Sequence, residues 1–275
     1  MPYRNAPYYV LVCIAVIAAG FWQSYFSVWG GVPWQFHAHG VAASIWVLMV
    51  LAQSWTPHHG HLSLHRAVGK SSLLLFPFLI GGLAAIIDLT GKGFVAHNDP
   101  VREMFGGEFL IGLALAIAAY VTLYYRALKY RRKVWTHSGY MLATPLILFE
   151  SPLSRVFGTW LPGLMIKGPQ DFDRLIPTIL WAMTVELAVI AVLWFNLRDR
   201  AKPFLVAGVF IVGQMLTMGL LSHNPILEAL LVVIGNLPSA VVVMTGFAIG
   251  AATSWAGWQA GKRPTQQISG VAQAA

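Results

Sequence analysis

The chain has 275 residues, of which 57% are hydrophobic and only 10% are charged, and its mean hydropathy is +0.65. A soluble globular protein carries about 25% charged residues because its surface faces water. The missing charge indicates a surface that faces lipid, which excludes a soluble enzyme, a nucleic-acid-binding domain and a disulfide-stapled secreted module. The net charge of +8 does not point to nucleic acid, because the basic residues lie between apolar runs, where they orient a membrane chain.

Apolar runs follow one another along the whole chain. A membrane span needs about 20 mostly apolar residues, and runs of this kind lie at roughly 8–29, 36–55, 65–90, 104–129, 134–152, 175–197, 203–222 and 229–257. The fifth run is short and contains Pro145 and Pro152, and the eighth is interrupted at Asn236 and Pro238. The sequence therefore predicts an all-α polytopic bundle of about eight spans. Residues 1–258 are expected to form one domain and 259–275 a disordered cytoplasmic tail.

The basic residues predict the orientation of this bundle. Eight spans place both termini on one side of the membrane, and most of the 18 lysine and arginine residues fall on that side. The positive-inside rule then puts both termini in the cytoplasm of a cell whose inner (plasma) membrane holds the protein. The connection at about 153–174 is too apolar for a free loop and is expected to lie along the outer interface.

Nine histidines fall in two layers, one near each predicted surface. Neutral imidazole is a common ligand for haem iron and transition metals. His65 opens the third span and His137 opens the fifth, so the two are expected to hold one haem from opposite faces if their helices pack together. His39 is expected to do the same at the outer face with His97 or His223. The alternative is that these histidines are interfacial anchors without a ligand.

Four acidic residues lie within or at the ends of spans, where a lipid-facing charge costs about 2.5–3.5 kcal/mol. Three of them, Asp88, Glu108 and Glu150, are expected at the same outer depth of the membrane as His37 and His39. Carboxylates together with histidines are the ligand set of a non-haem metal site. The predicted metal ligands are His37, His39, Glu108 and Glu150. The alternative is that Glu108 and Glu150 form ion pairs with Arg102 and Arg155.

Three motifs begin successive predicted helices. They are HAHGVAASIWVLMVLAQ with His37, His39, Gly40, Trp46 and Gln53, LHRAVGK with His65, Arg66 and Gly69, and HSGYMLAT with His137 and Met141. The arrangement resembles a broad group of bacterial multi-pass membrane proteins in which HxHG, HRxxG and HxxxM open helices. The resemblance covers about residues 35–155 and implies a membrane fold without an assigned activity. A more distant likeness is to membrane b-type cytochromes, although those usually carry their ligands well inside the spans.

The leading functional hypothesis is redox chemistry, and the enzyme class it would imply is a membrane oxidoreductase. It assigns haem b or a transition metal to the cofactor-binding residues His39, His65 and His137, with no covalent attachment because the chain has no CxxCH. One alternative is a small proton-coupled transporter whose path contains Asp88, Glu186 and Asn236. Another is an accessory subunit of a larger complex. The expected partners are the lipid bilayer and a membrane protein or second copy, and not nucleic acid.

Overall fold

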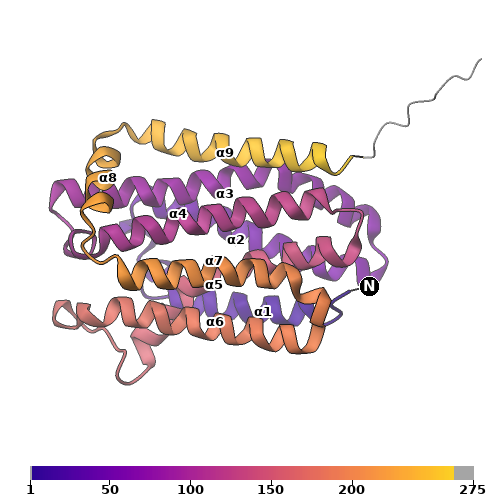
Figure 1. Cartoon of the computed structure of the whole chain (residues 1–275), viewed down its shortest axis with the longest axis horizontal. Helices are drawn as coiled ribbons and strands as arrows, with labels where there is room; N and C mark the ends of the chain where they lie inside the picture. The colour runs from indigo at the N-terminus through magenta and orange to yellow at the C-terminus, as the bar shows by residue number, and fades with distance from the viewer. Residues whose placement is uncertain (1, 263–275) are drawn as a thin grey trace, which may run out of the picture.

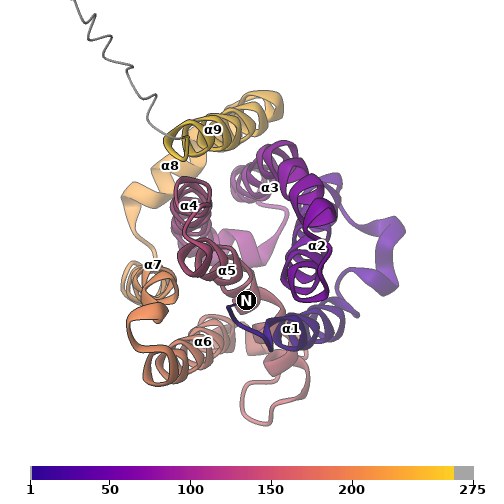
Figure 2. The same cartoon turned by 90° about the vertical axis from the view of Figure 1, so that its right-hand side faces the viewer.

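The computed structural model describes residues 2–262, and all regular secondary structure in that range is helical (Figures 1 and 2). Four short 3-10 helices, η1 Phe26–Gly31, η2 Thr56–His59, η3 Pro169–Arg174 and η4 Arg198–Ala201, lie between longer α-helices. The α-helices are α1 Ala6–Phe21, α2 Trp34–Trp55, α3 Leu62–Ala96, α4 Pro100–Lys129, α5 Val134–Trp160, α6 Leu175–Leu197, α7 Lys202–Leu220, α8 Pro225–Asn236 and α9 Ser239–Ala260.

Five helical stretches among the described residues are long and apolar enough to cross a membrane: 34–59, 62–96, 100–129, 169–220 and 239–260. The fourth stretch contains both α6 and α7, joined by η4. The apolar helices α1 and α8 are shorter. The chain is thus a multi-pass membrane protein by the length and composition of its helices, and the count of eight spans stays a prediction.

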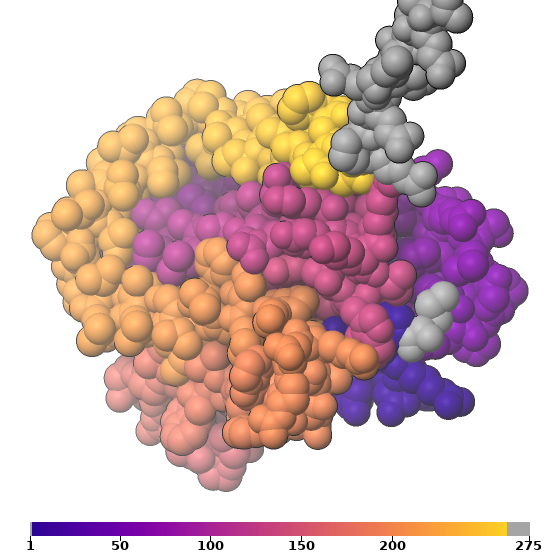
Figure 3. All heavy atoms as spheres, turned by 45° about the vertical axis from the view of Figure 1, so that its right-hand side comes forward, coloured from indigo at the N-terminus to yellow at the C-terminus, as the bar shows by residue number. Residues whose placement is uncertain are grey.

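The helices form one bundle in which α3 packs against α2, α4, α8 and α9, while α4 packs against α3, α5, α7 and α9 (Figure 2). In Figure 3, α4 reaches the surface between α7, in orange, and α9, in yellow. The described chain begins and ends at the same end of the bundle, on the right in Figure 1. The side of the membrane on which this end lies remains a prediction.

The first helix is shorter than the sequence predicts. α1 ends at Phe21, whereas the apolar run continues to residue 29, and the remainder folds into a turn and η1. Gly30 and Gly31 end this segment, and glycine is the least favourable ordinary residue in a helix. η1 instead packs its Trp29 ring against His37 of α2, with 4.4 Å between ring centroids. The expected span 8–29 is therefore wrong at its C-terminal end.

The fifth helix is longer than predicted. α5 continues through Pro145 and Pro152 to Trp160, so residues 153–160 are not part of an interfacial loop. Each proline removes one backbone hydrogen bond, which a membrane helix tolerates where neighbouring helices cover the backbone. Gly20 of α1 provides such cover, because a Cβ at this position would collide with the backbone of Pro152. The consequence is that Arg155 is carried on a helix of the bundle.

The interruption predicted in the last span is confirmed: α8 ends at Asn236 and α9 begins at Ser239. Lys92 of α3 lies at this break, where its Nζ donates to the Leu237 carbonyl at 2.9 Å and pairs with Asp88 at 2.6 Å. The predicted start of the tail at residue 259 is too early, since α9 includes residues 259 and 260. Near this end of α9, Gly257 packs on Leu128 of α4. Residues 263–275 of that predicted tail lie outside the described residues.

Candidate ligand-binding cavity

A cavity of about 670 Å³ lies inside one half of the bundle. Its lining comes from the C-terminal ends of α1, α3, α5 and α7 and the N-terminal ends of α2, α4 and α6, which is the half predicted to face outward. Apolar side chains such as Val47, Leu83 and Phe109 form much of its wall. Ionisable side chains also line it, among them His39, Glu150 and Arg155. The cavity therefore combines apolar walls with a few convergent polar groups, as small-molecule sites do.

Arg155 of α5 contributes a guanidinium group to the lining of this cavity. Its Nη1 donates to the carbonyl and to the hydroxyl of Ser151, at 2.8 and 2.7 Å, and its guanidinium lies over the Phe21 ring, 4.7 Å from the centroid. Among residues 2–262 it takes part in no salt bridge. Since a guanidinium has five N–H donors, most of this group's hydrogen-bonding capacity remains for a ligand.

His39 enters the cavity from α2. A Cβ at Gly82 of α3 would collide with the His39 backbone, so the glycine allows α2 and α3 to approach at this point and sets the depth of the imidazole. The His39 Nδ1 is buried and has no hydrogen-bond partner among the described residues. A buried polar nitrogen without a partner is unfavourable, and a bound ligand would supply the missing hydrogen bond.

Two carboxylates lie on the other side of the cavity. Glu150 of α5 is part of the lining, and Glu186 of α6 lies behind it, 1% exposed and within electrostatic reach of Glu150. The Glu186 Oε1 has no hydrogen-bond partner within residues 2–262. An isolated buried carboxylate is far more stable when it is protonated. The unpartnered Glu186 oxygen thus lies on α6, outside the residues that line the cavity.

The mouth of the cavity carries a second set of polar groups. Asp99 caps the N-terminus of α4, accepting from the backbone N–H groups of Val101 and Arg102 at 3.1 Å, and it also pairs with the Arg102 side chain. Tyr25 lies within 3.1 Å of the His37 Nδ1 through its hydroxyl. Burial raises the pKa of Tyr25 above its ordinary value, so the phenol is neutral at physiological pH. Of the two arginines that line the cavity, Arg102 is thus paired with Asp99, whereas Arg155 forms no salt bridge among the described residues.

The predicted haem ligands lie at the opposite end of the bundle. His137 donates from Nδ1 to the Ala127 carbonyl at 2.9 Å, because a carbonyl can only accept, and this leaves its Nε2 without the proton. His65 lies close enough to His137 to interact with it electrostatically, and its Nδ1 is buried without a partner within the described range. The two histidines are therefore near each other, but α3 and α5 do not pack directly together, and each packs on α4 instead. His39 is not part of the pair.

The four predicted metal ligands are only partly brought together. His39 and Glu150 line the same cavity, whereas His37 packs on Tyr25 and Trp29, and Glu108 is buried on α4 outside the cavity lining. No three histidine, cysteine or acidic side chains between residues 2 and 262 are grouped so that they would hold a metal ion. The expected outer partners of His39 also lie elsewhere: His97 pairs with Glu103 and His223 with Glu228 at the surface.

The residues predicted for a transport path lie in two separate regions. Asp88 pairs with Lys92 at the break between α8 and α9, and Asn236 is exposed there and donates to the Val232 carbonyl at 2.8 Å. Glu186 lies on α6, which packs on α5 and α7. Of the two alternative ion pairs, the first is not formed, since Arg102 pairs with Asp99 instead of Glu108. Arg155 and Glu150 interact electrostatically but lie beyond salt-bridge distance.

The sequence pattern does not predict Arg155 as a cavity residue, because it ends the fifth span at residue 152. The available signal was the spacing of Ser151 and Arg155, which lie four residues apart and face each other only if the helix continues. No protein-family model, curated protein or solved structure matches this chain significantly. The likeness to bacterial membrane proteins with HxHG, HRxxG and HxxxM motifs therefore stays a prediction that rests on the motifs themselves.

Proposed function

We propose that this multi-pass membrane protein binds a small amphipathic molecule with an anionic head in the cavity of the outer half. The observation that carries the proposal is Arg155, an arginine inside the bundle that lines a cavity and has no salt bridge in the described part of the chain. Charged residues within membrane helices are costly and mark substrate or ion sites by default. A volume of about 670 Å³ is also within the range of small-molecule sites.

The polar groups of the cavity define the chemistry of the ligand head. A planar guanidinium binds carboxylate or phosphate oxygens through two parallel hydrogen bonds. His39 can donate a further hydrogen bond from its unpartnered Nδ1. Glu150 requires a hydroxyl or another donor opposite it, or must itself be protonated. The ligand class is therefore an amphiphile with one deprotonated oxygen group and one neighbouring hydroxyl, and its apolar part lies against Leu83 and Phe109.

Mass spectrometry of small molecules extracted from the detergent-purified protein tests this proposal. The wild type is expected to retain an anionic amphiphile, and Arg155→Gln to lose it. Arg155→Lys is expected to retain it only partly, because lysine keeps the charge but not the two-pronged geometry. Arg132→Gln is the matched control, since Arg132 is exposed at the other end of the bundle. Equal retention by the wild type and Arg155→Gln would overturn the proposal.

A second candidate function is electron transfer through haem b held between His65 and His137. It is favoured by the hydrogen bond from the His137 Nδ1 to the Ala127 carbonyl, because haem- and metal-ligating histidines commonly donate their other ring N–H in this way and coordinate through Nε2. An absorption spectrum of the air-oxidised and then dithionite-reduced protein tests it. A Soret band that shifts on reduction and disappears in His137→Ala but not in His223→Ala is the expected result. A featureless spectrum of freshly purified protein would exclude this candidate.

A further inference from the structure

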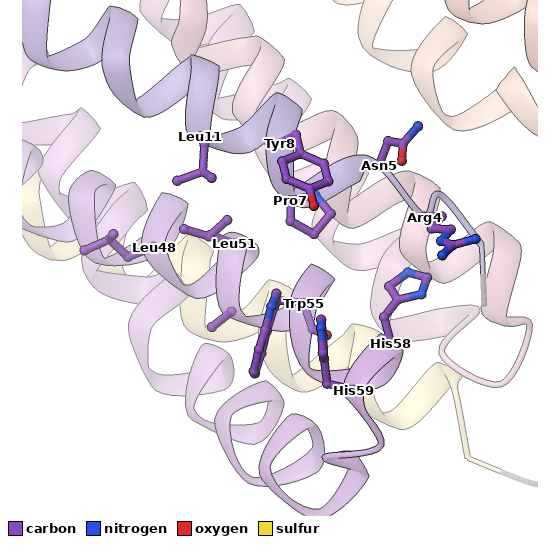
Figure 4. Close-up of a pocket in the computed structure, with 11 residues that line it drawn as sticks. Arg4, Asn5, Pro7, Tyr8, Leu11, Leu48, Leu51, Trp55, His58 and His59 are labelled. Atoms are coloured by element: carbon purple, nitrogen blue, oxygen red, sulfur yellow. The ribbon is translucent and has the colours of Figure 1, made fainter.

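A second hollow of about 1110 Å³ lies on the outside of the bundle, at the end opposite the cavity. It is a groove between the first turns of α1 and the last turns of α2, closed at one end by η2 (Figure 4). None of the residues that line it belongs to the cavity described above. The groove is therefore a separate surface, and conclusions about it do not depend on the proposed function of the cavity.

One end of the groove is basic. Figure 4 shows the side chains of Arg4 and His58 directed toward the same space. His59 lies beside them with its ring stacked on Trp55, the centroids 4.0 Å apart. No acidic residue lines the groove, and Arg4 forms no salt bridge with any residue of the described range. This end therefore carries positive charge that the protein itself does not neutralise.

The other end of the groove is apolar. Leu11 of α1 and Leu48 and Leu51 of α2 line it, and Leu11 and Leu48 are 49% and 54% exposed. On α2 the lining residues extend from Leu48 to Trp55, which is about two turns or about 10 Å, and on α1 they extend from Pro7 to Leu11, a little more than one turn. Exposed leucines on the outer face of a membrane bundle are in contact with lipid chains. The groove thus has a basic end followed by an apolar body. A phospholipid has the same arrangement, a charged head followed by apolar chains.

We propose that this groove is a specific site for one anionic phospholipid. The lipid phosphate lies against Arg4, His58 and His59, and one acyl chain lies on Leu11, Leu48 and Leu51. A zwitterionic lipid fits less well, because its own cationic group would meet the uncompensated positive charge of the groove. The site lies at the end of the bundle where most basic residues of the chain gather, which is the leaflet where anionic lipids interact with basic residues most strongly.

Native mass spectrometry of the full-length protein, with phosphatidylglycerol and phosphatidylcholine of identical chains added in detergent, tests the site. The wild type is expected to retain one phosphatidylglycerol in preference to phosphatidylcholine. Arg4→Gln and His58→Gln remove one basic side chain each, and we expect each to weaken retention about fivefold. Arg132→Gln, an exposed arginine at the same end but outside the groove, is expected to have no effect.

Leu51→Trp keeps the basic end and fills the apolar body. A lipid site predicts that this substitution also weakens retention of phosphatidylglycerol. Retention that is unchanged in Leu51→Trp but lost on addition of inorganic phosphate would show a site for free phosphate and overturn the proposal. Equal retention of the two lipids by the wild type, or a loss in Arg132→Gln as large as in Arg4→Gln, would overturn it as well.

Discussion

Buried polar side chains form hydrogen bonds between helices of the bundle. Trp46 of α2 is completely buried, and its Nε1 donates to the Thr144 hydroxyl of α5 at 2.9 Å. The Tyr120 hydroxyl of α4 donates to the Thr144 carbonyl at 2.8 Å. Since lipid offers no alternative partners, these groups must be satisfied within the protein. Thr144 therefore joins three helices at one point.

The contribution of this junction can be measured with a double-mutant cycle. Thr144→Val removes the hydroxyl without a large change in volume, and we expect it to lower the free energy of unfolding by about 0.6 kcal/mol, and by no more than about 1.7 kcal/mol. Trp46→Phe is expected to cost more, because it also leaves a void. Unfolding in mixed micelles gives the two single values and the double. Strict additivity of the two would show that the hydrogen bond contributes nothing.

At the scale of helices, α3 and α9 form the closest pair of the bundle. Gly246 and Gly250 lie on one face of α9, four residues apart, in the small-xxx-small spacing that lets membrane helices approach. A Cβ at Gly250 would lie 2.6 Å from the Pro77 Cα, and one at Gly246 would lie 2.9 Å from the Ile80 carbonyl. Backbone atoms cannot yield as a flexible side chain does, so the interface depends on these glycines.

Gly250→Leu is accordingly expected to separate α9 from α3 and to destabilise the protein by at least about 1–3 kcal/mol. Ala248→Leu is the matched control, because residue 248 is exposed on the other face of the same helix and is expected to tolerate the larger side chain. A thermal-stability assay of both variants in the same detergent measures the difference. Equal melting temperatures would mean that α3 and α9 do not pack through this face.

The orientation of the whole molecule is a prediction that single cysteines can test. Cys13 is the one native cysteine and is buried in α1, so Cys13→Ser gives a background without thiols. A membrane-impermeant maleimide is expected to label Asn98→Cys and Asp173→Cys in intact cells whose outer barrier is removed. It is expected to label Arg132→Cys and Asp199→Cys only after the membrane is opened. All four positions are exposed. The reverse pattern would invert the predicted orientation.

Sequence patterns predict the helices better than the site. The range of α6 agrees with its predicted span, and α2 begins within two residues of the predicted start, because polar or proline residues bound these apolar runs. Helices that are apolar all round give no periodic signal of which faces meet. His39, Glu150 and Arg155 line one cavity because α1 lies close to α5 and α2 lies close to α3. Gly20 and Gly82 allow these two approaches, which are properties of the packed bundle and not of any one helix. The boundary at Pro152 was wrong for the same reason, since tertiary cover compensates for the missing hydrogen bond.

The pairing of α3 with α9 also determines the order in which the protein is assembled. α3 ends at Ala96 and α9 begins at Ser239, so about 140 residues are synthesised between them, which takes roughly 7–30 s at usual rates of translation. During this interval the face of α3 around Gly81 lies in the bilayer without α9 packed against it. A chain that stalls before residue 239 is therefore an incomplete bundle, in which the α3 face that packs on α9 is uncovered. The last helix to be made is the one that covers this face of α3.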